Sequence, residues 1–180
     1  VYTAQTYMTI SVDATKLMAY REDLLDYIQQ KHNLRVSLTD LLMKITASAI
    51  LEHPVINTRW TDDGILYLKA VHMGMAMALD SGLIVPVIRD VDRKSISELA
   101  VDFGELVARA REGKTSLDEM QGGTFTVTNA GAVGGGHFFP IINFPQVAIL
   151  GLGRAALKPV VRANGDGEPE IVPRLIMPLT

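Results

Sequence analysis

The residues best suited to chemistry lie in one segment, 122–140, which reads GGTFTVTNAGAVGGGHFFP. The segment combines six glycines with four hydroxyl or amide side chains and one histidine, in an otherwise apolar chain. Residues 125–128 have the pattern of a strand that ends in Thr128 and is followed by Asn129. The glycines after them allow another group to approach the backbone closely. The segment therefore suits a hydrogen-bond donor that faces a tunnel or a neighbouring subunit. The alternative is a glycine-rich turn with no chemical role.

The spacing of these glycines does not match a nucleotide-binding loop. A phosphate loop needs Gly-x-x-x-x-Gly-Lys-Ser/Thr, whereas here the residue after the glycines is His137 and the segment contains no lysine. A dinucleotide fingerprint needs Gly-x-Gly-x-x-Gly between a strand and a helix, and that spacing is missing. The chain also lacks Gly-x-Ser-x-Gly and His-Glu-x-x-His, so neither a serine hydrolase nor a zinc protease is supported.

Length and composition favour one soluble globular domain. The chain has 180 residues, of which 48% are hydrophobic and 21% charged, and this is enough for one sizeable core. A net charge of −3 without a Lys/Arg cluster argues against a nucleic-acid partner. No apolar run predicts a membrane span or a signal peptide. Because the chain has no cysteine, a thiolate nucleophile and a Cys-ligated metal are excluded, and we expect no metal site.

Two helices are predicted in the first third of the chain. Residues 14–32 carry apolar side chains at helical spacing, and Asp13 can cap the first turn. The second helix begins after Ser37, which with Asp40 has the spacing of a capping box, and it stops before Pro54. The positions of the second helix that we expect to face inward are Leu38, Leu41, Leu42, Ile45 and Ala49.

A third helix and a set of strands complete the predicted fold. The helix follows Ser95 and Glu98, which form a second capping-box pattern, and it runs to Gly113. The stretches with a strand-like pattern are 6–12, 56–68, 71–90, 124–129, 146–153 and 170–180. The second and third of these are hairpins, around Asp-Asp-Gly and Asp-Ser-Gly turns. We therefore expect a mixed α/β domain in which helices pack on a sheet.

Six stretches, in order along the chain, resemble one family of enzymes. They read VDATKLMAYREDL, SLTDLLMKITASAILEHPVIN, MGMAMALDSGLIVPVIRD, EMQGGTFTVTNAG, HFFPIINFPQVAILGLG and PRLIMPLT. Together they resemble the catalytic domain of the dihydrolipoamide acyltransferases, the E2 components of 2-oxoacid dehydrogenase complexes. A short piece such as GLIVPV would mean little alone, but the resemblance spans nearly the whole chain in the family's order.

This resemblance implies a fold, an activity and an assembly. The fold is the chloramphenicol-acetyltransferase-like α/β fold, with helices packed on a mixed sheet. The activity is transfer of an acyl group from a lipoyl thioester to coenzyme A, so both compounds are substrates, and HFFPIIN and PRLIMPLT favour acetyl. The assembly is a homotrimer with active sites between subunits, and trimers can form cubic (24-mer) or dodecahedral (60-mer) cores. The E1 and E3 components would bind through other domains.

The resemblance also assigns a role to Thr128. In the family, a Ser or Thr at this strand end donates a hydrogen bond to the tetrahedral oxyanion, and the Thr128 of FTVT occupies that position. The family's general base is the histidine of a C-terminal His-x-x-x-Asp-Gly motif, and none of the four histidines of this chain begins one. His137 follows the glycines and is a candidate for contact with substrate. We expect His53 and His32 to be surface residues. His72 reads as a core or interface histidine.

Four further positions match coenzyme A contacts in the family. Arg21 and Ser37 match residues at the entrance, and Asn129 and Gly153 match residues nearer the pantetheine path. A guanidinium such as that of Arg21 suits the phosphates of the nucleotide end. The alternatives are that Arg21 is a solvated helix residue and that Ser37 is only a helix cap. A further family position, which can hold an aspartate near the cofactor, is Ala78 here, and this leaves that contact open.

The resemblance makes residues 1–180 one acyltransferase catalytic domain, incomplete at both ends. The lipoyl and subunit-binding domains would lie upstream and the catalytic histidine beyond Thr180, so the 180-residue chain alone is expected to be inactive. We expect the protein in the bacterial or archaeal cytoplasm, or else in the mitochondrial matrix. Two alternatives stay open. One is an inert core-building homologue that lost the base, and the other is a stand-alone small-molecule acetyltransferase of the same fold.

Overall fold

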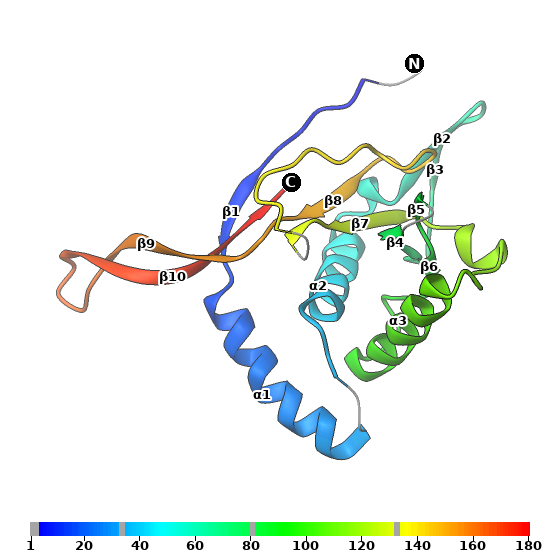
Figure 1. The fold of residues 1–180 in the computed structure, drawn as a ribbon. Coiled ribbons are helices and arrows are strands. Elements are labelled where there is room, and N and C mark those ends of the chain that lie inside the picture. Colours follow the sequence, from blue (N-terminus) through cyan, green and yellow to red (C-terminus); the bar gives the residue numbers. More distant parts are fainter. Residues whose placement is uncertain (1–3, 33–34, 80–81, 132–133) are drawn as a thin grey trace.

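A mixed β-sheet with α-helices packed against it forms the body of the protein, as the sequence predicts (Figure 1). The computed structural model describes residues 4–32, 35–79, 82–131 and 134–180. The helices are α1 (Thr15–His32), α2 (Leu38–Glu52) and α3 (Ile96–Arg111), with short 3₁₀ turns η1 (Pro54–Ile56) and η2 (Asp118–Met120). The strands are β1 (Ile10–Asp13), β2 (Thr58–Thr61), β3 (Gly64–Tyr67), β4 (Met73–Leu79), β5 (Gly82–Ile84), β6 (Val87–Ile88), β7 (Phe125–Asn129), β8 (Ile149–Leu152), β9 (Ala156–Ala163) and β10 (Pro169–Leu179).

The main sheet combines parallel and antiparallel pairs. Its strand order is β1-β10-β8-β7-β4-β5, with β6 paired to β4 and β9 paired to β10. β7 lies at its centre and runs parallel to both β4 and β8, while the other pairs are antiparallel. β2 and β3 form a separate two-stranded sheet. The central position of β7 holds its last residues in fixed register between two neighbouring strands.

The hydrophobic core lies between the sheet and helices α2 and α3. Met73 and Val127 of the sheet are fully buried there, together with Met43 of α2 and Leu99 of α3. The other side of β7 is polar: the Thr126 hydroxyl donates to Gln146 Oε1 at 2.6 Å, and both side chains are buried. Odd-numbered residues of β7 therefore face the helices, because successive side chains of a strand point to opposite faces.

Local sequence signals position the helices as predicted. Ser37 and Asp40 form a complete capping box at the start of α2. Ser95 and Glu98 form a second one at the start of α3, and Gly113 follows the end of α3 with φ +67°. Asp13 Oδ1 accepts the backbone N–H of Thr15 at the start of α1. None of the helices in the described ranges is both long and apolar enough to cross a membrane.

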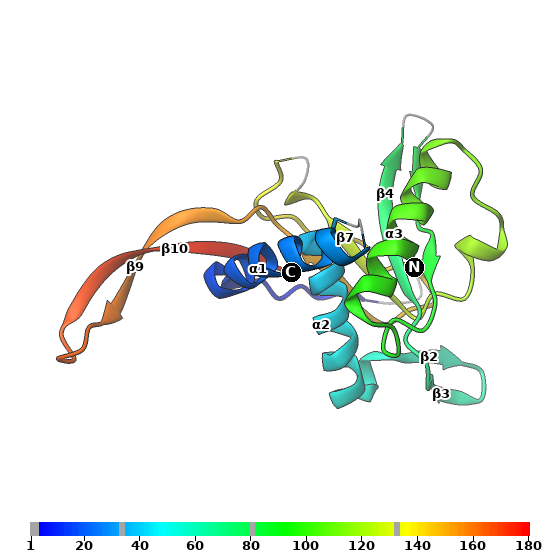
Figure 2. The ribbon, with the colours of Figure 1, turned by 90° about the horizontal axis from the view of Figure 1, so that it is seen from below.

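β9 and β10 form a long two-stranded arm that leaves the body of the protein. Eight residue pairs join the two strands, from Ala156 opposite Ile176 to Ala163 opposite Pro169. Figures 1 and 2 both show this arm extending away from the helices and from the rest of the sheet. We call the paired residues 156–163 and 169–176 the ribbon. The sequence indicated β10 but not β9, since ALKPVVRA shows no clean alternation of apolar and polar residues.

Two details of the predicted fold are wrong. The strand expected over 6–12 begins only at Ile10, and Met8 is exposed. In α2, Ile45 and Ala49 are exposed although they were expected to face inward. Helix α2 buries Met43, Ala47 and Ile50 instead, because its buried side faces the sheet core rather than following the stripe that begins at Leu38. The predicted turn residues 80 and 81 lie outside the described residues.

Candidate active site

Thr128 lies at the end of the central strand between two small residues. Its partners in the neighbouring strands are Ala76 on β4 and Gly151 on β8. The side chain is half-buried, and within the described part of the chain no hydrogen bond of its hydroxyl is found. Neither Ala76 nor Gly151 has a side chain long enough to cover this hydroxyl, so Thr128 can donate a hydrogen bond to a bound group.

The end of β7 opens onto a cavity of about 520 Å³ that is lined by residues of β4, α3 and the segment that contains Phe138. The polar side chains that line it are Thr39, Arg111, Thr128 and Asn129. Most of the other lining residues are apolar, among them Met75, Met77, Ala78, Phe103 and Phe138. An apolar cavity with a few convergent polar groups is the usual form of a small-molecule site. The described residues that line it include no histidine, aspartate or glutamate.

Asn129 connects this large cavity to a smaller one of about 220 Å³. Its Nδ2 donates to Thr39 Oγ1 at 3.2 Å, which ties the end of β7 to the first turn of α2. The smaller cavity is also lined by Gly153 and by the exposed Arg154. Three residues predicted for the site, Thr128, Asn129 and Gly153, therefore line two adjoining cavities.

The glycines after β7 serve contacts within the chain. A Cβ at Gly131 would lie 2.8 Å from the Gly153 carbonyl oxygen, and one at Gly135 would lie 2.9 Å from Ala130 Cβ. The Gly135 carbonyl accepts the backbone N–H of Arg154. This part of the loop therefore packs on the end of β8 in the same chain. Only Gly134 and Gly136 have open space where a Cβ would stand, and so only part of the segment can face a second chain.

The two aromatic residues of the segment differ in exposure. Phe138 is half-buried and covers Gly151, where a Cβ would lie 2.9 Å from the ring. Phe139 is 62% exposed and its ring makes an edge contact with Tyr7 at 5.0 Å between centroids. The ring of Phe138 has room because Gly151 carries no side chain, so of the two aromatics only Phe139 is exposed.

Arg21, Ser37 and Asp40 form a cluster at the start of α2. The Ser37 hydroxyl donates to Asp40 Oδ2 at 2.7 Å and accepts the Asp40 backbone N–H. Burial raises the pKa of the Asp40 carboxyl, although the hydrogen bonds from Ser37 and the nearby charge of Arg21 oppose the shift. Arg21 Nε and Asp40 Oδ1 are buried and make no hydrogen bond among the described residues. The hydroxyl of Ser37 thus serves the helix cap, whereas Arg21 keeps a donor to spare.

None of the described histidine side chains lines either of the two cavities. His137 is exposed and is absent from the lining of both. His72 Nδ1 accepts the backbone N–H of Asp90 at 3.0 Å, and it holds Asp90 at a left-handed φ of 54°. His53 is exposed at the end of α2, and the side chain of His32 lies outside the described part. No described histidine is therefore placed to act on a group bound at Thr128.

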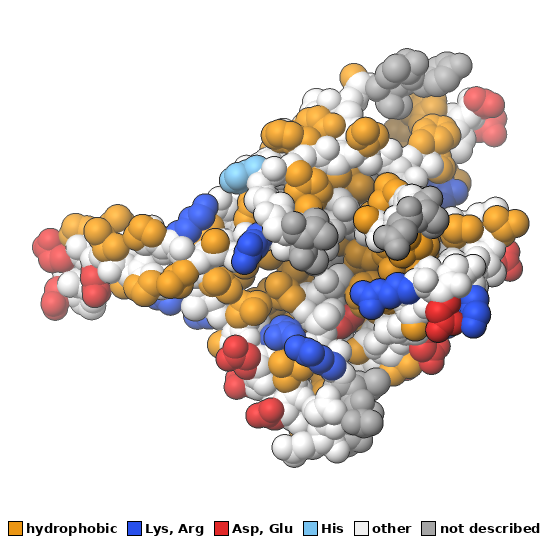
Figure 3. All heavy atoms as spheres, viewed as in Figure 1, with side chains coloured by type: hydrophobic (Ala, Val, Ile, Leu, Met, Phe, Trp, Pro, Cys, Tyr) orange, Lys and Arg blue, Asp and Glu red, His pale blue; other side chains and the backbone are white. Residues whose placement is uncertain are grey.

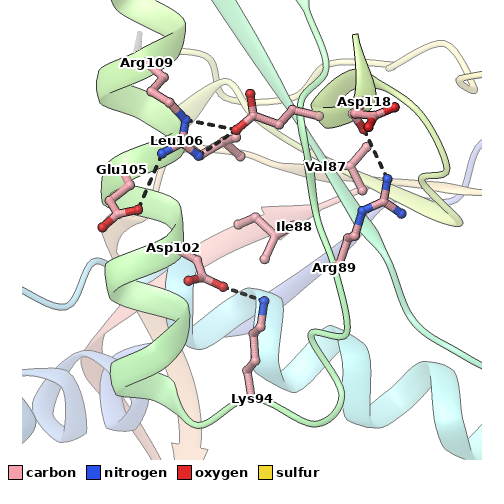
Figure 4. Close-up of a pocket in the computed structure, with 10 residues that line it drawn as sticks. Val87, Ile88, Arg89, Lys94, Asp102, Glu105, Leu106, Arg109 and Asp118 are labelled. Carbon is pink, nitrogen blue, oxygen red and sulfur yellow. Dashed lines mark hydrogen bonds and ion pairs between the residues drawn. The ribbon is translucent and has the colours of Figure 1, made fainter. Parts of the chain in front are cut away.

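A third cavity, of about 300 Å³, lies between α3, β6 and η2 and is rich in charges (Figure 4). Arg109 Nη2 lies 2.7 Å from Glu119 Oε1, and Arg109 Nη1 lies 3.4 Å from Glu105. Lys94 Nζ lies 2.5 Å from Asp102. These opposite charges are paired within the chain. We therefore interpret the lining of this cavity as a structural ion-pair network that connects η2 to α3.

Glu119 is the centre of this network. Hydrogen bonds from the backbone of Ser116 and from Arg109 lower the pKa of the Glu119 carboxyl. On the other side of η2, Arg89 donates to the Asp118 and Gln121 carbonyls. The turn that leads into β7 is thus held by an arginine on each side. Among the described residues, no group of three His, Cys, Asp or Glu side chains is placed to hold a metal ion.

The sheet order and the helices packed on the sheet define a class of fold. The structure matches a chloramphenicol acetyltransferase with a TM-score of 0.51 at 15% identity, over 96% of this chain and 75% of the other. This similarity shows the acetyltransferase-like fold that the sequence predicted. The model of the family "2-oxoacid dehydrogenases acyltransferase (catalytic domain)" matches residues 2–180. The chain belongs to that family.

Individual relatives agree with this assignment. The acetyltransferase component of the acetoin cleaving system of Bacillus subtilis is 38% identical over 98% of this chain and 43% of its own length. The lipoamide acyltransferase component of the branched-chain α-keto acid dehydrogenase complex of B. subtilis is 37% identical, over 87% of this chain and 37% of its own length. The chain thus spans less than half the length of these curated relatives.

Solved structures are also similar. A dihydrolipoamide acetyltransferase from Azotobacter vinelandii, studied for the role of one serine, one histidine and one asparagine in catalysis, has a TM-score of 0.87. It is 38% identical and is matched over 96% of this chain and 69% of its own. The cubic core of a pyruvate dehydrogenase multienzyme complex matches with the same TM-score, identity and coverage.

Sequence reasoning did not single out several of the residues that line the cavities. Arg154 lines the smaller cavity, and Arg111 and Phe138 line the larger one. The position of Arg154 directly after Gly153 was a usable signal, since a cation beside a glycine at a strand end suits an anionic ligand. Arg111 gave no such signal, because its approach to the cavity depends on how α3 packs across the sheet.

Proposed function

We propose that this chain transfers an acyl group, acetyl in the first instance, from a dihydrolipoyl thioester to coenzyme A. The observation that carries the proposal is Thr128, a hydroxyl at the end of the central strand that faces a largely apolar cavity. Membership of the acyltransferase family supports the reaction class. The relatives include both an acetyltransferase and a branched-chain component, so acetyl rests on sequence similarity alone.

Thr128 acts on the tetrahedral intermediate of thioester exchange. The thiolate of coenzyme A attacks the thioester carbonyl, a C–S bond forms, and the carbonyl oxygen becomes an oxyanion. The intermediate then collapses with departure of the dihydrolipoyl thiolate. A fixed hydroxyl donor at the oxyanion contributes about 10²- to 10³-fold in rate. Thr128 suits this role because it is only half-buried and lines the large cavity.

The proton of the attacking thiol needs an acceptor from outside this cavity. The described lining residues offer no histidine or carboxylate, and general-base catalysis contributes roughly 10²- to 10⁴-fold. We place the acceptor on a histidine of a His-x-x-x-Asp-Gly segment that a second copy brings to Thr128. Residues 1–180 then act as one catalytic domain of a longer protein, in which lipoyl and subunit-binding domains supply the acyl group and bind E1 and E3.

Coenzyme A enters along the smaller cavity. Asn129 and Gly153 line that cavity, and Arg154 at its exposed side suits a phosphate. Arg21 lies at the start of α2 and has an unused buried Nε, which suits the nucleotide end. Ser37 contributes through the helix cap that positions this region. His137 stays a candidate for contact with the exposed part of the substrate.

Copies of the chain associate as a trimer, and trimers build a larger core in the cytoplasm. The cubic core among the similar structures supports assembly. The open side of the glycine segment, at Gly134 and Gly136, is the part of the loop that can face a neighbouring chain. Phe139 beside it is exposed, and an aromatic next to bare backbone suits a close interface.

The direct experiment measures transfer from acetyl-dihydrolipoamide to coenzyme A. The 180-residue chain is compared with a longer form that includes the segment after Thr180. We expect turnover in the longer form and little in the 180-residue chain. An inactive longer form that still assembles would support the core-building alternative. Acetylation of chloramphenicol or a similar small alcohol, without use of dihydrolipoamide, would support the stand-alone acetyltransferase instead.

A further inference from the structure

The first turn of α2 meets the end of β7 at the junction of the two cavities of the candidate site. Thr39 and Asn129 line the larger cavity, while Leu38 and Asn129 line the smaller one. The hydrogen bond of 3.2 Å from Asn129 Nδ2 to Thr39 Oγ1 therefore lies where the two cavities adjoin. A ligand that extends from the smaller cavity toward Thr128 has to pass this pair of side chains.

The direction of this hydrogen bond leaves the proton of the Thr39 hydroxyl available. The Asn129 amide donates, so the Thr39 oxygen accepts and its own O–H can still donate. Within the described ranges, no other hydrogen bond of this hydroxyl is found. The Ser37 hydroxyl differs, because it donates to Asp40 Oδ2 in the helix cap. The first turn of α2 thus offers, at Thr39, a donor that the described part of the fold does not use.

Burial makes this unused donor favour a ligand. Thr39 is only 8% exposed. The larger cavity that it lines is mostly apolar and includes Met75, Met77 and Phe103. Figure 3 shows hydrophobic side chains in the recess above α3, where Figure 1 places β4. A buried hydroxyl without an acceptor loses the hydrogen bond that water would give it, and a ligand that brings an acceptor restores that bond.

The acceptor that suits Thr39 is a neutral oxygen. Arg111 is the single cation among the described residues that line the larger cavity, and its side chain is exposed. A carboxylate or phosphate at Thr39 would therefore be buried without a charge partner, which is costly. An amide carbonyl is a strong acceptor and carries no charge. The polarity of the site thus favours an amide carbonyl as the partner of the Thr39 hydroxyl.

We infer that the Thr39 hydroxyl binds the amide carbonyl nearest the thiol of coenzyme A. The inference rests on the proposed function and deepens it, because it names a residue that holds the acceptor arm. In the pantetheine arm of coenzyme A, a short alkyl linker separates this amide from the thiol. Thr39 is bonded to Asn129, the residue after Thr128, so it lies near the proposed reaction centre. Dihydrolipoamide fits less well, since a longer alkyl chain separates its amide from its thiols.

The two threonines of the site then act at different stages. The amide of coenzyme A is the same in the bound substrate and in the transition state, so Thr39 contributes to affinity in both. Thr128 faces a charge that exists mainly in the transition state and therefore contributes to kcat. An interaction of the first kind changes KM, and one of the second kind changes kcat.

Thr39→Val tests the contact, because it removes the hydroxyl and keeps the branched shape of the side chain. In the longer, active form of the chain, it should raise the KM for coenzyme A by about three- to tenfold and leave kcat within about twofold. Thr39→Ser should restore most of the affinity. Thr46→Val is the matched control on α2, since the Thr46 hydroxyl donates to the Leu42 carbonyl and lines neither cavity.

Truncated acceptors show whether the hydroxyl acts through the amide. N-acetylcysteamine keeps the amide nearest the thiol, and an alkanethiol of the same length lacks it. Thr39→Val should lower kcat/KM for N-acetylcysteamine by about three- to tenfold and that for the alkanethiol by less than about twofold. Equal effects on the two thiols would overturn the inference. A loss that depends instead on the amide of the acetyl donor would assign the contact to the dihydrolipoyl arm and would also overturn it.

Binding measured without turnover separates this contact from the proposed reaction. Calorimetric titration of the longer form with coenzyme A should give a dissociation constant about three- to tenfold higher in Thr39→Val than in the parent or in Thr46→Val. Circular dichroism checks that the variants are folded. If the parent shows this difference but transfers no acyl group, the proposed reaction fails and the Thr39 contact stands. Equal dissociation constants, or a parent that does not bind coenzyme A, would overturn the contact.

Discussion

Gly153 packs against the carbonyl oxygen of Gly136 so closely that a Cβ at position 153 would lie 2.3 Å from that oxygen. A Cβ at Gly153 would also lie 2.5 Å from Pro178 Cγ. Gly153→Ala should therefore destabilise the protein by roughly 1–3 kcal/mol, because the loop after β7 must move. Thermal unfolding measures the effect. Gly165→Ala is the control, since nothing lies within 4 Å of a Cβ there. Equal melting temperatures for the two variants would contradict this packing.

Thr128 should matter for the rate and little for binding. In an active, longer form of the chain, Thr128→Ala should lower kcat by about 10²-fold or more and leave KM nearly unchanged. The reason is that the hydroxyl bonds to a charge that exists mainly in the transition state. Thr128→Ser keeps a hydroxyl and should have a mild effect. Steady-state kinetics with coenzyme A decide the matter, and an alanine variant within about twofold of the parent would make the strand end purely structural.

Ser37→Ala should reduce stability rather than affinity for coenzyme A. The hydroxyl is already engaged with Asp40, so its loss should cost about 0.5–2 kcal/mol of unfolding free energy. Ser95→Ala removes the same type of cap from α3 and is the matched control. We expect similar stability losses and an unchanged KM for coenzyme A in both, whereas Arg21→Ala should raise that KM. A higher KM in Ser37→Ala alone would reveal a direct contact.

Stability should depend on pH through Glu119. Hydrogen bonds from Ser116 and Arg109 lower its pKa in the folded state. An acid whose pKa is lowered by folding stabilises the protein above its ordinary pKa, and this stabilisation is lost as pH falls toward the lowered value. In chemical unfolding at a series of acidic pH values, the free energy of unfolding should fall less steeply with decreasing pH in Glu119→Gln than in the parent. Glu105→Gln removes the longer contact to Arg109 and should change the pH profile less.

A large side chain on the open side of the glycine loop should be compatible with the folded monomer and should disrupt the oligomer. Gly136→Arg leaves the fold intact, because a Cβ at Gly136 meets nothing within 4 Å. If this side faces a neighbouring chain, the variant should lower the apparent mass in sedimentation equilibrium. Gly135→Arg cannot serve this purpose, since a Cβ there would press on Ala130 in the same chain. An unchanged oligomer in Gly136→Arg would remove the glycine loop from the interface.

The sequence predicted the parts of the fold that local signals determine. Both capping boxes, at Ser37 and at Ser95, form where the spacing predicts them, and Thr128 lies in the last two residues of the predicted strand. The exposure of Ile45 could not be predicted, because the buried side of α2 depends on the sheet against which the helix packs. The cap role of the Ser37 hydroxyl was one of two open alternatives, and only the contact with Asp40 supports it over a ligand contact.

The polar residues of the candidate site could be predicted from the sequence, whereas the residues of α3 that line its cavity could not. Thr128, Asn129 and Gly153 carry recognisable local patterns, and the structure places them along two adjoining cavities. Arg111 and Phe103 reach the larger cavity from α3, and nothing in their own sequence neighbourhood indicates that approach. Helical periodicity identifies which side of α3 is buried, but the position of the helix over the sheet is a tertiary property.

The pairing of β1 with β10 has a consequence for biosynthesis. Ile10 lies opposite Leu179, so the first strand of the sheet has no partner until nearly all of the described chain has left the ribosome. The central strands β4, β7 and β8 also pair in parallel across long stretches of sequence, and contacts of this kind form slowly because the intervening loops must close first. β1 therefore stays without its strand partner during synthesis until β10 emerges, and the edge of the sheet that β1 completes is the last to form.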